Sequence, residues 1–406
     1  MKRYGNLLPK ISDIKNVEYA DVRARQNKRS KYGINKHDEN RQEENISLAK
    51  SLADSSYKTS PYTTFKIYEP KERIIFRLPY FPDRIAHHAI MNILEPIWKS
   101  VFISNTYSCI KGRGINKCRA DVRKTLDRYP DKTIYCLKLD IKKCYPSLKH
   151  DVLKRIIRKK IKDKGLLVVL DEIIDSSDGV PIGNYLSQYF ANLYFAYFDH
   201  WIKEECKVKF YFRYADDIVI LHSDKKFLHN LLVAIKFYMH EILKVEIKSN
   251  YQIFPVDSRG LDFVGYRFYH THTLLRKSIK QRLKKSINNY LRGKIGIEEL
   301  QKTLSSYFGW CKYCDSKHLL YNIELQTGLK FSNWKGKEVN IISICGYPIY
   351  FMEKIKYSKY YKLHFVYNHQ SYITTTVSKS LLANLEKPKY FIIKSYGKKN
   401  KLQRKT

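Results

Sequence analysis

The order of hydrophobic and polar positions divides the chain into helical and extended stretches. Apolar residues at helical spacing predict helices, and strict alternation or short apolar runs between turn residues predict strands. The pattern predicts helices within 1–60 and over 84–102, 148–174, 184–205, 226–243 and 277–330, and strands or hairpins over 62–80, 134–141, 209–222 and 261–269.

Two adjacent carboxylates occupy the tip of one predicted hairpin. Tyr214, Ala215, Asp216 and Asp217 stand between the apolar runs 210–213 and 218–221. Neighbouring acids repel each other unless a cation lies between them, and Mg²⁺ prefers oxygen ligands and brings substrate phosphates with it. A pair of such ions can clamp the attacking and leaving oxygens of a phosphoryl transfer. An acidic β-turn without a cation is the alternative, because Asp is a common turn residue.

Composition and charge narrow the class of partner. The 406 residues suffice for one large domain or two to three modest ones. Lys and Arg number 76 against 39 Asp and Glu, giving a net charge of +37 and a pI near 9.7, which favours nucleic acid as a partner over an anionic membrane. The sequence has no apolar run of membrane-spanning length and no signal peptide at its start, so a cytoplasmic protein is expected.

Cysteine usage adds little chemistry. The eight cysteines are scattered and are expected to be reduced thiols. Cys311 and Cys314 are spaced like metal ligands and His318 is near them, but no second Cys/His pair completes a zinc site.

The acids follow one another in an informative order. Asp140 ends the predicted strand 134–141, and a helix, a loop and a helix separate it from Asp216 and Asp217. With the motifs below, this order resembles that of reverse transcriptases of the bacterial retroelement kind, over roughly residues 20–330. The resemblance implies an α+β, right-hand polymerase fold with a small basic, β-rich C-terminal domain. Its parts would be fingers (1–130), palm (131–270, with part of 150–180 returning to the fingers), helical thumb (271–330) and C-terminal domain (331–406).

The resemblance also implies the catalytic groups. Asp140, in the motif that runs from Leu137 to Tyr145, would bind two Mg²⁺ ions together with Asp216 and Asp217, and the Ile141 carbonyl could bind one of them. Mn²⁺ is an alternative metal. Lys248 matches a lysine that protonates the leaving pyrophosphate, and an exposed lysine on a basic surface is the alternative.

Five residues match the family's nucleotide-binding positions. A planar guanidinium such as that of Arg73 suits phosphate geometry, and this residue would grip the triphosphate. The ring of Tyr145 would lie under the sugar and exclude a 2′-OH, which favours dNTPs over an RNA polymerase reaction, although a packed core ring is the alternative. Gly183 would allow backbone to approach the base pair. Ile182 and Gln188 depart from the Gln and Pro that many reverse transcriptases carry, and simple packing is the alternative for Ile182.

Primer and template contacts are expected from Tyr214, Arg113, Gly265 and Tyr266, the last two in a run that matches the primer-grip strand. Residues 306–310 resemble a thumb helix of the group II intron type. The pattern favours a structural role for Arg84, as a partner of Asp83 or of backbone, and leaves the two following histidines structural.

The last 76 residues lie outside the resemblance. They carry 15 Lys and Arg against three Glu, with strand-like runs at 339–344, 361–367, 371–377 and 390–394 and a helix at 379–385. A small OB-like barrel that binds single strands fits this pattern, and an appendage that closes the thumb is the alternative.

The expected function is an RNA-directed DNA polymerase that uses dNTPs and a dedicated non-coding RNA template and releases a DNA product. A role in bacterial antiviral defence is favoured over a diversity-generating retroelement enzyme. A maturase-like RNA-binding scaffold is the alternative of another class. An accessory protein or a second copy of the chain is a further expected partner.

Overall fold

The computed structural model describes residues 2–28, 32–68 and 72–327, followed by separate strands as far as residue 404. The chain divides into two compact units, residues 1–259 and 260–406, and each is described by itself. The expected helix at 379–385 lies outside the described residues, as do positions 69–71 of the predicted hairpin turn.

Helices and a four-stranded sheet build the first unit. In chain order its elements are α1 (Leu8–Ile11), α2 (Ile14–Ala24), α3 (Tyr32–Glu39), α4 (Arg41–Ala53), β1 (Thr63–Ile67), β2 (Arg73–Arg77), the π-helical turn η1 (Tyr80–Arg84), α5 (Ile85–Lys99), α6 (Ile115–Arg128), η2 (Pro130–Lys132), β3 (Tyr135–Asp140), α7 (Cys144–Ser147), α8 (His150–Arg158), α9 (Lys164–Asp175), α10 (Tyr185–His200), η3 (Trp201–Glu205), β4 (Phe210–Tyr214), β5 (Asp217–His222), α11 (Lys225–Phe237), η4 (Tyr238–Ile242), β6 (Gln252–Pro255) and α12 (Val256–Arg259).

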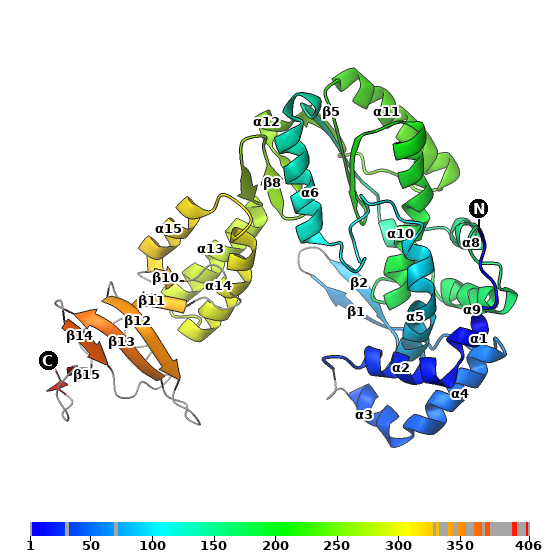
Figure 1. Ribbon diagram of the computed structural model, residues 1–406, viewed down its shortest axis with the longest axis horizontal. Helices are drawn as coiled ribbons and strands as arrows, with labels where there is room; N and C mark the ends of the chain where they lie inside the picture. Colours follow the sequence, from blue (N-terminus) through cyan, green and yellow to red (C-terminus); the bar gives the residue numbers. More distant parts are fainter. Residues whose placement is uncertain are drawn as a thin grey trace. The chain divides into compact units, whose positions relative to one another are not determined.

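The sheet is antiparallel, in the order β4-β5-β3-β6. The interior residues of β5, from Ile218 to Leu221, are all buried, as expected for an apolar strand covered on both faces. The long helix α10 is buried along most of its length and packs on α5 and α8. Helices α1 to α4, drawn in blue, lie together, and α1 and α2 of this group pack on α5 (Figure 1). The core therefore lies between the sheet and these helices.

Helix α6 and strand β6 are among the elements of this unit that were not predicted from the sequence. Helix α6 is mostly polar and buries only Cys118, Val122 and Leu126, one residue on each of three successive turns. Strand β6, which pairs with β3, has four residues. It is too short to show a clear alternation of hydrophobic and polar residues in the sequence. The predicted helix 148–174 is two helices, because the Asp163 side chain accepts a hydrogen bond from Leu166 N and starts α9 afresh.

The second unit begins with β7 (Leu261–Phe263), β8 (Tyr266–Phe268) and β9 (Thr273–Leu275), which form a three-stranded antiparallel sheet. The helices α13 (Lys277–Leu291), α14 (Ile297–Cys311) and α15 (Lys317–Thr327) follow. The expected basic helices of 277–330 are thus present as three helices. Strands 261–275 group with these helices rather than with the first unit.

The C-terminal segment contains β10 (Lys330–Ser332), β11 (Asn340–Ile344), β12 (Tyr347–Lys354), β13 (Tyr361–Tyr367), β14 (Gln370–Ile373), β15 (Ile392–Ser395) and β16 (Gln403–Arg404). Its β-rich character agrees with the strand-like runs of the sequence. The strands follow one another in sequence order. An OB fold is a Greek-key barrel, so the OB-like expectation is wrong in strand order.

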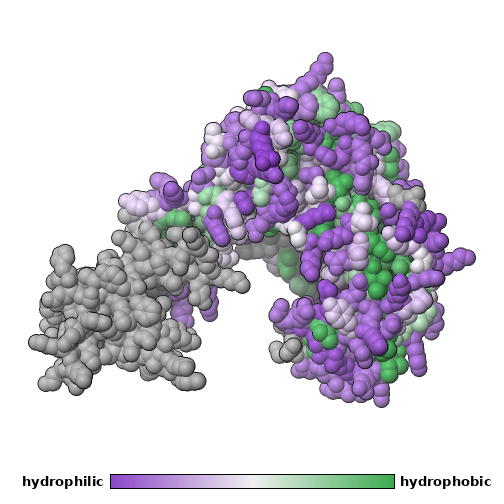
Figure 2. Space-filling view, viewed as in Figure 1, coloured by the Kyte–Doolittle hydropathy of each residue, from purple (hydrophilic) through white to green (hydrophobic). Residues whose placement is uncertain are grey.

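Hydrophilic residues dominate the surface of the described part of the chain that Figure 2 shows, with small hydrophobic areas between them. None of the described helices combines the length and hydrophobicity that crossing a bilayer requires.

Candidate active site

Three carboxylates meet where β3 and β5 pair. Asp140 ends β3 and lies directly opposite Asp217, the first residue of β5. Directly opposed side chains in an antiparallel pair lie on one face, about 5 Å apart at Cβ. Asp216 lies in the β4–β5 turn, and its carbonyl accepts a hydrogen bond from Ile141 N at 3.3 Å. The structure therefore brings together the three acids that the sequence predicted.

Burial and repulsion between neighbouring carboxylates raise the pKa values of Asp216 and Asp217. The Asp217 Oδ1 atom is buried and has no hydrogen-bond partner among the described residues. Burial, together with the charges of Asp140 and Asp216 and against the opposing charge of Lys138, raises the pKa of Asp217 to about 6. Burial and the charge of Asp140 also raise the pKa of Asp216, while Lys248 and Arg73 oppose that rise. Such perturbed acids in one cluster are typical of a functional site.

Two lysines supply positive charge. Residues 246–248 pair with the end of β3 through Lys248 N to Asp140 O and Lys142 N to Glu246 O, both 2.8 Å. This pairing places Lys248 Nζ 2.6 Å from Asp140 Oδ1. Lys248, expected near the site, is thus one of its members. Sequence reasoning missed Lys138, whose Nζ lies 3.4 Å from Asp217 Oδ2.

The residues suit a hard cation in their chemistry. Carboxylate oxygens are the ligands that Mg²⁺ prefers, and the unpartnered Oδ1 of Asp217 is an acceptor that such an ion could use. Within the described ranges, however, no group of three or more acidic, imidazole or thiol side chains is already arranged around a metal position. The Lys248 ammonium contacts Asp140 Oδ1, so a cation would compete with this lysine for that oxygen. Metal ligation by Asp140, Asp216, Asp217 and the Ile141 carbonyl stays a prediction.

The pKa of Asp217 predicts that acidity stabilises the metal-free fold. An Asp in an unfolded chain titrates near about 4, whereas Asp217 in the folded protein titrates at about 6. Between these values the folded state binds more protons, so the free energy of unfolding should fall as pH rises through this window. We expect Asp217→Asn to have a shallower fall in urea unfolding at several pH values in EDTA. Identical pH profiles for the two proteins would contradict this.

Hairpin β1–β2 brings Arg73 to the carboxylates. Phe76 N donates a hydrogen bond of 2.8 Å to Ile182 O, and a Cβ on Gly183, whose φ is +123°, would collide with the Phe76 carbonyl. The backbone that comes close to Gly183 in this structure is therefore that of β2. The expected approach of Gly183 to a base pair stays a prediction. At the near end of this strand the charge of Arg73 acts on Asp216 and on Tyr145.

The other nucleotide-binding positions lie around the same loop. Tyr145 is half-buried on α7, and its carbonyl accepts a hydrogen bond of 3.0 Å from Val180 N. Burial raises the pKa of its hydroxyl. Ile182 is half-buried and Gln188 is exposed on α10. Their roles toward a nucleotide stay predictions, as does that of Gly183.

The expected primer and template residues are more dispersed. Tyr214 is half-buried at the end of β4, next to the acidic turn. Arg113 Nη1 donates to the carbonyls of Ile103 and Thr106, which gives this side chain a structural role in its own loop.

Gly265 and Tyr266 belong to the second unit and are described within it alone. A Cβ on Gly265 would collide with the ring of Trp310, and the buried Tyr266 donates from its hydroxyl to Trp310 O at 3.2 Å. The Tyr266 side chain is thus used in packing, and a primer contact here would have to come from backbone.

The expectation that Arg84 pairs with Asp83 is wrong. Asp83 Oδ1 instead accepts hydrogen bonds from the Tyr57 hydroxyl at 2.6 Å and from Ser60 N at 3.0 Å. A sequence shows that an acid and a base are adjacent, but not which neighbour from another element reaches the acid first.

A buried ion pair supports the acidic turn, and sequence reasoning missed it. Arg213 and Asp199 are 1% and 0% exposed, and Arg213 Nη2 lies 2.6 Å from Asp199 Oδ2. Arg213 Nη1 also donates to Ala215 O at 3.1 Å, in the turn where Ala215 has a φ of +54°. The signal in the sequence is a charged residue inside the aromatic run 210–214, which a buried strand tolerates only with a partner.

Comparison with known proteins agrees with this geometry. Residues 69–268 match the family model described as reverse transcriptase (RNA-dependent DNA polymerase). The chain is 22% identical over 254 residues to the protein YkfC of Escherichia coli, covering 51% of this chain and 67% of YkfC. It is 25% identical over 212 residues to the group II intron-encoded protein LtrA of Lactococcus lactis, covering 49% of this chain and 34% of LtrA.

Two further matches are a plant maturase and a solved structure. The chain is 22% identical over 166 residues to nuclear intron maturase 4 of Arabidopsis thaliana and spans 20% of it. Apo telomerase from Candida tropicalis matches with a TM-score of 0.41 and 13% identity, over 66% of this chain and 60% of that one. The chain thus spans from a fifth to two thirds of these relatives.

The family match contains all three clustered carboxylates and the arginine of the adjoining hairpin. On the strength of this match and these relatives, residues 69–268, about half of the chain, form a segment of the reverse transcriptase (RNA-dependent DNA polymerase) family.

Proposed function

We propose that this chain copies a dedicated non-coding RNA into DNA, by transfer of deoxynucleotides to a primer hydroxyl. The single observation that carries the proposal is the meeting of Asp140, Asp216 and Asp217 at paired strand ends, with Asp217 Oδ1 buried and unpartnered among the described residues. The family match supports the reaction class. The net charge of +37 supports a polyanionic template and product.

Each side chain near the carboxylates has a proposed role that follows from its position. Asp140, Asp216 and Asp217 would hold the divalent ions, which supply charge neutralisation at the phosphates and activation of the primer hydroxyl when bound. Arg73 extends from β2 toward the same acids and can bind the triphosphate of the incoming nucleotide. Tyr145 packs beside this space and can exclude a ribose 2′-OH. Lys248, released from Asp140, can donate a proton to the departing pyrophosphate.

The use of the DNA is the finer part of the proposal. The run from Pro181 to Gln188 has the Ile-Gly-Asn-x-x-Ser-Gln form, which resembles diversity-generating and defence-associated enzymes. We favour antiviral defence because of the additional β-rich C-terminal segment. A diversifier requires a neighbouring template repeat and an accessory protein, so the genes beside this one distinguish the two roles.

The test is to purify the protein with its native locus co-expressed and to sequence the bound nucleic acid, for wild type and for Asp216→Asn/Asp217→Asn. We expect a discrete RNA with both proteins and complementary DNA with wild type alone. Errors scattered at template adenines would assign the chain to diversification, and faithful or repetitive DNA to defence. RNA with both proteins and DNA with neither, even in cells challenged with phage, would favour the maturase-like scaffold. DNA with the variant as well would overturn the assignment of the carboxylates.

A further inference from the structure

An open groove lies beside α11 in the first unit. Its volume is about 1140 Å³, and its lining comes from α10, η3, α11, η4 and the residues that follow α5 and α8. Three of the lining residues are large hydrophobic residues that remain exposed, Val233 by 69%, Phe237 by 65% and Ile242 by 43%. Exposed apolar residues that border a hollow are typical of a protein-binding surface.

These three residues form one apolar stripe. Val233 and Phe237 are four residues apart on α11, which places them on the same face of the helix. Ile242 follows five residues later in η4, one π-helical turn further along the same face. Leu231 and Ile235, on the opposite face of α11, are buried in the core. The helix therefore packs through one face and carries the apolar stripe on the other.

Aromatic rings line the recess next to this stripe. Trp201 and Tyr238 are half-buried, and their ring centroids lie 4.7 Å apart. The Nζ atom of Lys159 lies 4.0 Å from the centroid of the Tyr197 ring, which is also part of the lining. An exposed ring, that of Phe237, thus stands beside a recess with aromatic walls. A projection and a recess on one face allow two identical copies to fit each other.

The lysines and glutamates of the groove balance in charge. Lys159 and Lys160 follow α8, and Glu204 and Glu205 belong to η3. Lys160 and Glu205 make no ion pair with any residue in the described ranges. The whole chain carries +37, so two copies repel each other over most of their surface. A balanced face lets two such copies approach, and it gives no net attraction for the phosphates of nucleic acid.

We propose that two copies of this chain associate across the groove about a two-fold axis, with Phe237 of each copy inserted into the aromatic recess of the other. A two-fold interface brings the same patch of both copies together. The lysines of one groove then face the glutamates of the other, so the patch is self-complementary in charge as well as in shape. A helix of an unrelated protein would fill the apolar stripe without making use of this balance of charges.

The proposed interface leaves the carboxylates open. Leu139 of β3 belongs to the same buried core as Leu231 and Ile235 of α11. Asp140, the next residue, points to the other face of the sheet, because successive side chains of a strand alternate. Helix α11 therefore covers the face of the sheet opposite the carboxylates, and the apolar stripe lies on the outer side of this helix. Association of two copies is thus independent of the proposed function.

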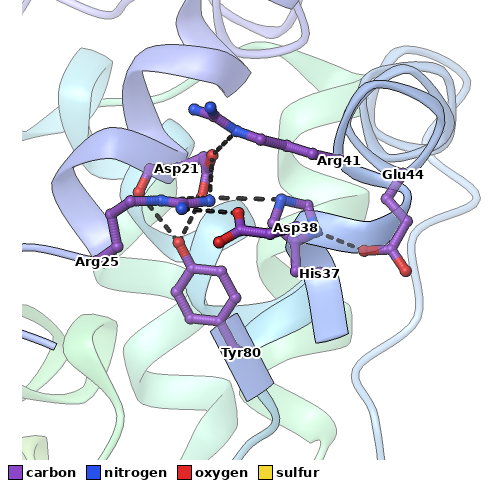
Figure 3. Close-up of polar contacts among 7 residues, drawn as sticks. All are labelled: Asp21, Arg25, His37, Asp38, Arg41, Glu44 and Tyr80. Atoms are coloured by element: carbon purple, nitrogen blue, oxygen red, sulfur yellow. Dashed lines mark hydrogen bonds and ion pairs between the residues drawn. The ribbon is translucent and has the colours of Figure 1, made fainter. Parts of the chain in front are cut away.

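A second cavity supplies a matched control. It has a volume of about 830 Å³, and its lining includes Val22, which is 47% exposed, together with Arg25, Asp38 and Arg41. Figure 3 shows these three charged groups in one network around the buried Asp21. Their charges are neutralised within the chain, so this cavity lacks the self-complementary charges of the groove. Val22→Glu changes an exposed helical valine here in the same way as Val233→Glu does in the groove.

The first test measures the dimer Kd of the full-length protein by sedimentation equilibrium. Nuclease treatment removes bound nucleic acid beforehand, because a polyanion would bridge two basic chains. We expect Val233→Glu and Phe237→Glu each to raise the dimer Kd at least about thirtyfold, since a charge would be buried at the centre of the interface. Val22→Glu should change it by less than about twofold. Circular dichroism of each variant checks that it is folded.

The second test addresses the two-fold arrangement through the charges. Lys159→Glu/Lys160→Glu and Glu204→Lys/Glu205→Lys each set like charges against each other in a homodimer. At about 0.15 M salt, where exposed charges interact over roughly 8 Å, each should raise the dimer Kd about tenfold or more. An equimolar mixture of the two variants, with different tags, should form a heterodimer with nearly the wild-type Kd, because every charged contact again joins opposite signs.

A wild-type protein that remains a monomer at about 0.1 mM would overturn the proposal. A dimer that Val233→Glu leaves intact, or that Val22→Glu weakens equally, would do the same. A mixture of the two charge variants that stays monomeric would refute the two-fold contact. A monomer that loses a protein encoded at its own locus on Phe237→Glu would assign the groove to that protein instead. Since no measurement requires DNA synthesis, a dimeric but inactive protein would refute the proposed function and not this interface.

Discussion

Asp217→Asn is expected to lower DNA synthesis by about a thousandfold or more while the protein remains folded. Asn has nearly the shape of Asp, so the pairing of β3 with β5 at this position is retained. The change removes a negative charge from the face where phosphates and their counter-ions must meet. It also removes a desolvated carboxylate whose Oδ1 has no described partner, so the metal-free protein should be at least as stable as wild type at neutral pH.

Primer extension on a defined RNA template, with thermal melting of the same preparations, would measure both effects. Asp175→Asn is the control, because this carboxylate also pairs with a lysine, Lys154, but lies on α9 away from the sheet. The control should extend primers at the wild-type rate. Synthesis by Asp217→Asn within about tenfold of wild type would show that Asp217 does not take part in the chemistry.

Asp199→Asn is expected to have the largest effect on stability, a loss of about 3–5 kcal/mol in the free energy of unfolding. The substitution leaves the guanidinium of Arg213 buried without its counter-charge. Asp199 also accepts hydrogen bonds from the Tyr211 hydroxyl at 2.5 Å and from Thr106 Oγ1 at 2.9 Å. Because Arg213 also holds the carbonyl of Ala215, we expect primer extension to fall together with stability.

Urea unfolding followed by circular dichroism would measure this loss. Asp171→Asn is the matched control, since it breaks a partly exposed pair with Arg158 that is expected to contribute less than about 1 kcal/mol. The double variant Asp199→Leu/Arg213→Met should recover part of the stability, because it removes the unpaired charge as well. A loss in Asp199→Asn no greater than that in Asp171→Asn would contradict the structural role of this pair.

The carboxylates could be predicted from the sequence because local pattern places each of them at a strand end and the resemblance to reverse transcriptases groups them. Apolar runs on both sides of Asp216 and Asp217 require a hairpin with the acids at its tip, and Asp140 ends a third apolar run. The partners of charged groups could not be predicted in the same way. Lys138 reaches Asp217 only because β3 lies beside β5, and Asp83 binds Tyr57, which is 26 residues away in sequence. Such contacts depend on tertiary packing, which no spacing rule contains.

The contact between hairpin and loop has a consequence for how this enzyme can change over evolution. Ile182 joins β2 through its carbonyl oxygen, so attachment of the hairpin makes no demand on the side chain at this position. Gly183 is the opposite case, since any side chain there would push Phe76 away and move Arg73 with it. Position 182 can thus accept other side chains, whereas position 183 requires glycine. Sequence drift at position 182 can therefore change the side chain of this loop without detaching the hairpin that carries Arg73.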